Sequence, residues 1–276
     1  MSKRKVRAAA IQMASGPNVS ANLLKANQLV EEAVDQGAGL VVLPENFAFM
    51  GEHEKDVCAL REHDGDGPLQ EYLSQLAKRL GIWLVGGTIP LEGHSNSKVR
   101  AACLVYNDAG KRMARYDKMH LFDVDLVEAD EHYAESAVIE PGDEPVVIDS
   151  PFGRLGIAVC YDLRFPELFR KLADGGMEVI CLPAAFTAIT GKAHWEVLVR
   201  ARAIENLSYV IAAAQGGFHL NGRETHGHSM IVDPWGTVLA QVPRTTGAVG
   251  CQLDLGHLAT TRRNFPALSH RRIGCD

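Results

Sequence analysis

The segment LGIAVCYDLRFPEL, residues 155–168, predicts a buried strand that runs directly into a turn and a helix. Pro166 is well placed to open that helix, because proline is tolerated in a first helical turn. A cysteine at this junction, Cys160, lies near backbone N–H groups whose partial positive charge favours the reactive thiolate. Since a cysteine in a buried strand is more often a small hydrophobic core residue, the rest of the chain must decide between a nucleophile and packing.

Around this segment, short apolar strands alternate with amphipathic helices. An all-apolar stretch such as residues 40–43 is typical of a strand buried on both faces. Tight turns between successive strands favour mixed over purely parallel sheets, so we expect an α/β layered fold in a single domain over residues 1–276. The helices expected from periodicity lie at residues 22–34, 69–80, 166–173 and 193–204. The expected strands lie at residues 6–13, 40–43, 82–89, 101–106, 112–116, 145–149, 154–159, 179–182, 209–214, 228–232 and 237–240.

The composition argues against several classes of protein. The 276 residues are 46% hydrophobic and 22% charged, which is typical of a globular chain with a sizeable core. The net charge of -6 argues against a nucleic-acid partner, because phosphate binding depends on clustered lysine and arginine. We find no stretch of membrane-span length and no signal-peptide pattern, so we expect no membrane partner. The six cysteines lack CxxC spacing, which predicts reduced thiols and a cytoplasmic location.

Three polar residues stand where predicted strands end, and a fourth lies in a long polar loop. Glu45 follows the strand at 40–43, Lys118 follows the strand ending at 116, and Cys160 ends its own strand. Glu135 lies in the loop between Lys118 and the next strand. Because α/β folds usually place ligands beyond the carboxyl ends of their strands, we expect these side chains to share one pocket.

The four residues together fit the chemistry of a cysteine nucleophile that attacks an amide carbonyl. Glu45 can take the thiol proton, pass it to a leaving amine and later activate the water that cleaves a thioester. Lys118 can stabilise the tetrahedral oxyanion together with a backbone N–H such as that of Tyr161. Glu135 can hold Lys118 and share its charge, so that these groups titrate as a coupled set. This chemistry requires no cofactor and no metal, and we expect none.

Three motifs resemble the signatures of the nitrilase superfamily of carbon–nitrogen hydrolases. They are LPEN at 43–46, YDKMHLF at 116–122 and VCYDLRFPE at 159–167, and they occur in family order within a similarity that spans roughly residues 6–272. The resemblance implies Glu45 as base, Lys118 as oxyanion-stabilising cation, Cys160 as nucleophile and Glu135 as the additional glutamate. It also implies a four-layer α-β-β-α sandwich that dimerises.

The C-terminal half is most similar to the Nit1-type amidases of that superfamily. The likeness rests on PAAFTAITGKAHWEVL at 183–198, RARAIEN at 200–206, GHSMIVDPWG at 227–236 and HRR at 270–272. It implies hydrolysis of deaminated glutathione to 2-oxoglutarate and cysteinylglycine. An omega-amidase acting on 2-oxoglutaramate or a carbamoyl-amide hydrolase would use the same residues. The alternative of a different class is a non-catalytic interaction domain on the same fold. Its sequence mark would be the loss of one of the four residues, and this chain keeps all four.

The expected substrate-binding residues are less well defined than the reacting ones. Tyr161 and Arg164 follow the nucleophile, and Arg164 can either hold a substrate carboxylate or pair with Glu167 across Pro166. Phe186 and Thr187 follow a strand end and can line the pocket.

Other residues suit structural roles better. Trp195 and Val199 have helical spacing and are expected to pack. His219, His226 and His228 lack a partner at ligand spacing, which argues against a metal-dependent hydrolase. The acidic stretch at residues 123–131 is expected to be solvated loop.

Overall fold

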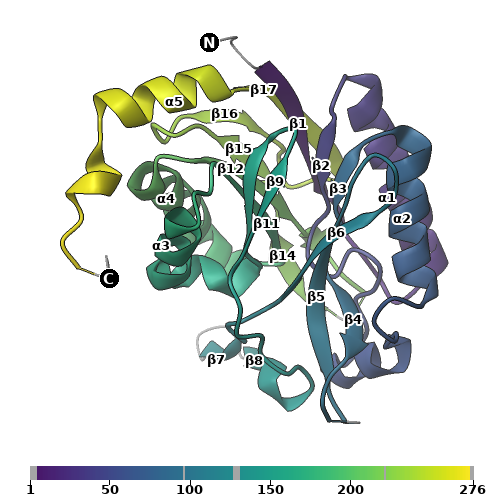
Figure 1. Ribbon diagram of the computed structural model, residues 1–276. Helices are drawn as coiled ribbons and strands as arrows, with labels where there is room; N and C mark the ends of the chain where they lie inside the picture. Colours follow the sequence, from purple (N-terminus) through teal and green to yellow (C-terminus); the bar gives the residue numbers. More distant parts are fainter. Residues whose placement is uncertain (1–4, 96, 127–130, 221, 274–276) are drawn as a thin grey trace.

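The computed structural model describes residues 5–95, 97–126, 131–220 and 222–273. Two mixed β-sheets pack face to face, and helices cover their outer faces, so that the chain forms the predicted four-layer α-β-β-α sandwich (Figure 1). No helix in the described ranges is long and apolar enough to span a bilayer. The five cysteines within them are all free thiols.

The first sheet has seven strands in the order β17-β1-β2-β3-β5-β4, with β6 paired to β5. Parallel pairing joins β1, β2 and β3, and the remaining pairs are antiparallel. Helices α1 (Val19–Asp35) and α2 (Pro68–Leu80) cover its outer face. The strands are β1 (Lys5–Gln12), β2 (Leu40–Val42), β3 (Trp83–Val85), β4 (Ile89–Glu92), β5 (Val99–Tyr106), β6 (Arg112–Asp117) and β17 (Gly247–Asp254).

The second sheet has six strands in the order β16-β15-β12-β11-β10-β9, of which β10, β11 and β12 are parallel. Helices α3 (Pro166–Asp174) and α4 (Ala188–Asn206) cover its outer face, and α5 (Leu255–Asn264) follows β17. The strands are β9 (Val146–Ser150), β10 (Gly153–Ile157), β11 (Val179–Ala184), β12 (Tyr209–Ala214), β15 (Met230–Val232) and β16 (Val238–Gln241).

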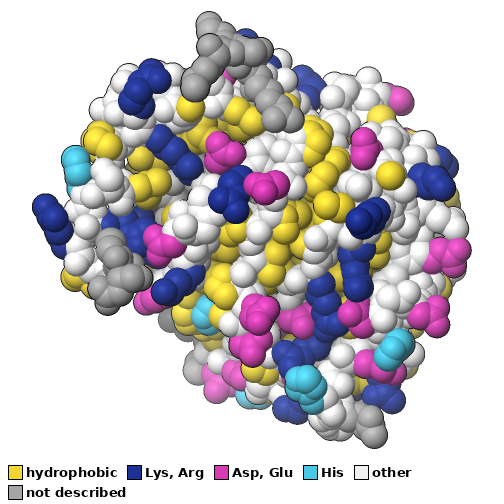
Figure 2. All heavy atoms as spheres, in the orientation of Figure 1, with side chains coloured by type: hydrophobic (Ala, Val, Ile, Leu, Met, Phe, Trp, Pro, Cys, Tyr) yellow, Lys and Arg dark blue, Asp and Glu magenta, His cyan; other side chains and the backbone are white. Residues whose placement is uncertain are grey.

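Strand β1 shows how the alternation of side chains builds two cores. Ala8 and Ala10 belong to the apolar cluster between the sheets, whereas Ala9 and Ile11 belong to the cluster beneath α1 and α2. Successive side chains of a strand point to opposite faces, so both faces of β1 must be apolar. Figure 2 shows a further band of apolar side chains over β6 and β9, where the edges of the two sheets meet.

The structure corrects three expectations about local structure. The single strand expected at 82–89 is wrong, because Gly86, Gly87 and Thr88 separate β3 from β4. The solvated loop expected at 123–131 is wrong in its described part, since β7 (Asp123–Leu126) pairs with β8 (Glu131–Ala134); residues 127–130 lie outside the described residues. Helix α4 begins five residues earlier than expected (Ala188 rather than 193), because the Thr187 side chain caps it by accepting the Thr190 N–H at 3.3 Å.

Candidate active site

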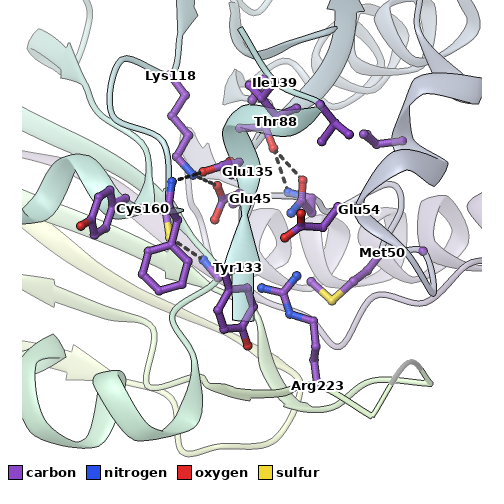
Figure 3. Close-up of a pocket in the computed structure, with 18 of the residues that line it drawn as sticks. Glu45, Met50, Glu54, Thr88, Lys118, Tyr133, Glu135, Ile139, Cys160 and Arg223 are labelled. Atoms are coloured by element: carbon purple, nitrogen blue, oxygen red, sulfur yellow. Dashed lines mark hydrogen bonds and ion pairs between the residues drawn. The ribbon is translucent and has the colours of Figure 1, made fainter. Parts of the chain in front are cut away.

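The four predicted residues converge on one cavity of about 740 Å³ at the carboxyl ends of strands (Figure 3). Glu45 follows β2, and Lys118 follows β6 directly. Cys160 begins the 3-10 helix η4 (Cys160–Arg164) just after β10, and Glu135 begins η3 (Glu135–Ala137) after β8. The placement expected from strand ends therefore brings together residues that are far apart in the chain.

Lys118 is the centre of this arrangement. Its Nζ donates to Glu45 Oε1 at 2.9 Å and to both carboxylate oxygens of Glu135 at 2.7 and 2.8 Å. The Lys118 side chain is only 2% exposed. Glu135 Oε2 also accepts the Phe122 N–H at 2.6 Å, which anchors this carboxylate to the loop after Lys118. A buried ammonium between two carboxylates is held in one orientation, with its charge directed into the cavity.

The surroundings shift the pKa values of this cluster. Burial by itself would lower the pKa of Lys118, but the Glu135 and Glu45 carboxylates outweigh it and hold that pKa well above its ordinary value. Burial raises the pKa of Glu135, against the opposing effect of Lys118. Burial and the Glu45 charge raise the pKa of the Cys160 thiol well above its ordinary value, although Lys118 acts in the opposite direction. Burial and the Glu45 charge thus favour the protonated thiol in the unliganded protein.

Cys160 occupies an unusual backbone conformation. Its φ of 49° lies in the left-handed region, which non-glycine residues seldom adopt and which often marks functional sites. The Ala185 N–H donates to the Cys160 Sγ at 3.4 Å from the end of β11. The sharp turn thus aims the thiol into the cavity and places the N–H groups of η4 beside it.

A buried carboxylate that the sequence pattern did not single out joins the nucleophile turn to the Lys118 loop. Asp162 Oδ2 accepts from the Tyr116 hydroxyl at 2.6 Å and from the Val159 N–H at 2.7 Å. Its Oδ1 accepts from the His120 N–H at 3.1 Å and lies 2.7 Å from His120 Nδ1. Asp162 is completely buried. Its position two residues after Cys160, at the start of a helical turn, is the signal that could have identified it.

Two further interactions, also missed from the sequence, fix the peptide group that joins Glu45 to Asn46. Gln215 Nε2 donates to the Glu45 carbonyl oxygen at 2.9 Å. The Asn46 N–H donates to Thr88 Oγ1 at 2.9 Å. Gly87, with φ of 59°, makes room for this turn, because a Cβ there would lie 2.2 Å from the Pro44 carbonyl oxygen.

The four residues expected to bind substrate all line the cavity, though in different ways. The Arg164 guanidinium lies over the rings of Tyr161 and Phe186, at 5.7 and 5.3 Å from their centroids, and donates to His194 Nδ1 at 3.1 Å. Arg164 thus faces the pocket, and within the described residues it forms no ion pair with Glu167. Thr187 uses its hydroxyl to cap α4, so it contributes mainly through local structure.

The remaining predicted residues have structural surroundings. Trp195 and Val199 are fully buried, as expected for packing. His219 lies 2.8 Å from the Ser15 carbonyl oxygen and 2.7 Å from Thr225 Oγ1. His226 and His228 stack at 4.6 Å, and nowhere in the described ranges do three potential ligands gather as a metal site would require.

The chain is similar to known proteins over nearly its whole length. Residues 7–263 match the family model described as carbon-nitrogen hydrolase. The chain is 41% identical to a deaminated glutathione amidase of Yersinia enterocolitica, over 96% of this chain and 92% of the relative. It is 43% identical to the mouse protein of the same name, over 96% and 82%.

Solved structures show the same fold. Saccharomyces cerevisiae Nit3, described as a member of branch 10 of the nitrilase superfamily, superposes with a TM-score of 0.85 at 30% identity and 95% coverage of both chains. The Caenorhabditis elegans NitFhit protein superposes with a TM-score of 0.89 at 37% identity. That match covers 99% of this chain but 66% of the longer NitFhit chain.

Proposed function

Because this chain belongs to the carbon–nitrogen hydrolase family, we propose that it is a cofactor-free amidase that hydrolyses deaminated glutathione to 2-oxoglutarate and cysteinylglycine. The observation that carries the proposal is the largely buried Glu45–Lys118–Glu135 cluster, which lies beside the Cys160 thiol on one side of a substrate-sized cavity. The substrate follows from the relatives that share about two fifths of their residues with this chain over nearly its whole length.

The first half-reaction acylates Cys160. As the Sγ attacks the amide carbon, the thiol proton moves to a Glu45 oxygen and the carbonyl π electrons move onto oxygen. The high pKa of the resting thiol fits this order, because the proton leaves only when attack begins. The oxyanion lies against Lys118 Nζ and the Tyr161 N–H, two fixed donors in a site sheltered from water.

Loss of the amine completes the acylation, and hydrolysis of the thioester is the second half-reaction. When the tetrahedral intermediate collapses, the C–N bond breaks and protonated Glu45 gives its proton to the departing nitrogen. Glu45 then takes a proton from water, whose oxygen attacks the Cys160 thioester through a second oxyanion. Cleavage of the C–S bond returns the proton to sulfur and frees the acid. Glu135 remains beside Lys118 throughout, where it keeps the ammonium charged and in place.

Arg164 is the cation best placed to hold the acyl half of the substrate. It lies one turn after Cys160, and the Tyr161 and Phe186 rings fix its guanidinium. The acyl half ends in a 2-oxo carboxylate, and a guanidinium fork matches such a group with two parallel hydrogen bonds.

We also propose that the chain is one hydrolase domain that acts as a homodimer in the cytoplasm. Exposed apolar side chains spaced seven or eight residues apart along α4 support the dimer, because exposed apolar patches often mark protein interfaces. Near the C-terminal end of α4, Trp235 packs edge-on against Phe265 at 5.6 Å, and both are more than half exposed. The free thiols support a reducing compartment. The exposed apolar residues of α4 are Ile189, Val197 and Ile204.

The experiment that tests the function is hydrolysis of a substrate panel. We expect kcat/KM for deaminated glutathione to exceed the values for 2-oxoglutaramate, a carbamoyl amino acid and a simple nitrile by orders of magnitude. Cys160→Ala should keep the fold, as judged by circular dichroism, and lose turnover of every compound. A preference for 2-oxoglutaramate would contradict the proposal that deaminated glutathione is the substrate. An active Cys160→Ala protein would contradict the proposed mechanism.

A further inference from the structure

The cavity extends well beyond the reacting groups. Its volume of about 740 Å³ lies within the range of pockets that enclose whole drug-sized ligands, roughly 300–1,000 Å³. Cys160 and Lys118 lie on one side of it, and the labelled side chains of Tyr133 and Arg223 lie on another (Figure 3). A ligand anchored at Cys160 therefore has room to continue toward Arg223.

Arg223 enters the cavity from a different part of the fold than Arg164. It lies between β13 (Gly216–Phe218) and β14 (Glu224–His226), and its guanidinium lies over the Tyr133 ring at 4.8 Å from the centroid. Tyr133 is buried and packs against Phe122 at 5.0 Å. An arginine stacked on a fixed aromatic ring loses little further freedom when it binds a ligand.

We propose that Arg223 binds the carboxylate at the far end of the leaving group, so that the site selects amides whose amine half carries a terminal carboxylate. This inference rests on the proposed function, because cysteinylglycine is such a leaving group. The planar guanidinium matches a carboxylate with two hydrogen bonds, and such charge-assisted pairs give both affinity and orientation.

The position of Glu45 gives the direction of the leaving group. Since Glu45 must reach the departing nitrogen, the amine half has to pass the Glu45 carboxylate on its way out from Cys160. Figure 3 shows Glu45 between Cys160 and the part of the cavity where Arg223 and Glu54 lie. Arg164, on the Cys160 turn itself, is left for the acyl half, so the two arginines serve opposite ends of one substrate.

The test compares a substrate that ends in a carboxylate with the same substrate ending in a neutral carboxamide. We would measure kcat/KM for deaminated glutathione and for its C-terminal carboxamide in the wild type, Arg223→Gln and Arg223→Lys. The wild type should prefer the carboxylate by about 10- to 100-fold, the value of one charge-assisted pair. Arg223→Gln should bring the ratio near one, and Arg223→Lys should recover part of it. Arg244→Gln is the matched control, since Arg244 stacks on Phe218 of the same hairpin, and it should keep the wild-type ratio.

Product inhibition separates this inference from the proposed function. Cysteinylglycine should inhibit wild-type turnover of 2-oxoglutaramate more strongly than cysteinylglycinamide does, and Arg223→Gln should abolish the difference. If deaminated glutathione is not hydrolysed but this difference persists, the substrate is wrong and the subsite stands. If it is hydrolysed with equal losses for carboxylate and carboxamide in Arg223→Gln, the subsite is wrong. The subsite is also wrong if adding Glu54→Gln to Arg223→Gln restores the preference, because Arg223 would then only neutralise Glu54.

Discussion

Replacing Lys118 with methionine should separate the structural role of its charge from the catalytic role that we propose for it. Methionine fills a similar volume and is flexible enough to pack in the same space. The substitution removes the Nζ that donates to Glu45 and to both oxygens of Glu135. The buried Glu45 carboxylate and the partly buried Glu135 carboxylate are then left facing each other without a cation.

The expected loss of stability follows from this geometry. Removing one partner of a buried ion pair costs about 3–5 kcal/mol, because the remaining charge stays buried and uncompensated. Lys118 lowers the pKa of Glu135, so its loss should raise that pKa further above the unfolded value. When a carboxyl group has a higher pKa in the folded state than in the unfolded state, the protein loses stability as the pH rises from the unfolded-state pKa to the folded-state pKa. The destabilisation should therefore be larger at about pH 8 than at about pH 5.

The assay pairs urea unfolding at several pH values with kcat/KM. Lys118→Met should lower kcat/KM by about 10²–10³-fold or more, the usual loss for one oxyanion donor. Adding Glu135→Gln removes one of the two unpaired charges and should restore much of the stability. It should not restore activity, because the oxyanion still lacks its cation. Two results would refute the reasoning: a Lys118→Met protein as stable as wild type at every pH, or recovery of activity in the double variant.

Three other perturbations test how the site is held. Asp162→Ala should lower the unfolding free energy by about 2–4 kcal/mol, because the buried Tyr116 hydroxyl and Val159 N–H lose their acceptor. It should also reduce kcat more than it raises KM, and unchanged kinetics would contradict a positioning role. Gly87→Ala should reduce activity and stability sharply, because its Cβ would meet the Pro44 oxygen. Gly81→Ala, at a φ of 63° with open space around it, is the control and should cost only about 1 kcal/mol. Alkylation of Cys160 in the unliganded protein should still accelerate above its ordinary pKa of 9.0, and a plateau near neutral pH would show that the thiol is already ionised.

Local patterns predicted much of the sandwich. The bounds expected for β12 match the structure, and the expected hairpin of β5 and β6 is formed. Strand β17 was missed, because residues 247–254 have two glycines and weak alternation, and their partner β1 lies at the other end of the chain. The break between β3 and β4 depends on the close approach of Gly87 to Pro44, which only the tertiary fold creates.

The site residues also divide into those that local sequence patterns could predict and those whose position depends on the tertiary fold. Glu45, Lys118 and Cys160 could be expected to share a pocket because each follows a strand, but β2 and β6 belong to the first sheet and β10 to the second, so the packing of the two sheets is what brings them together. Glu135 shares its segment with other carboxylates, so geometry is needed to show that it is the one that reaches Lys118. Gln215 and Arg223 lie on connections whose position depends on distant contacts, and periodicity carries no information about them.

The central claim, a thioester at Cys160, is tested most directly by rapid acid quenching during turnover of deaminated glutathione, followed by mass spectrometry of intact protein and its peptides. The mechanism predicts a transient mass increase of one 2-oxoglutaryl group, mapped to Cys160 and absent from Cys160→Ala. Full turnover with no adduct under conditions that preserve a synthetic thioester standard, or an adduct on another residue, would contradict it.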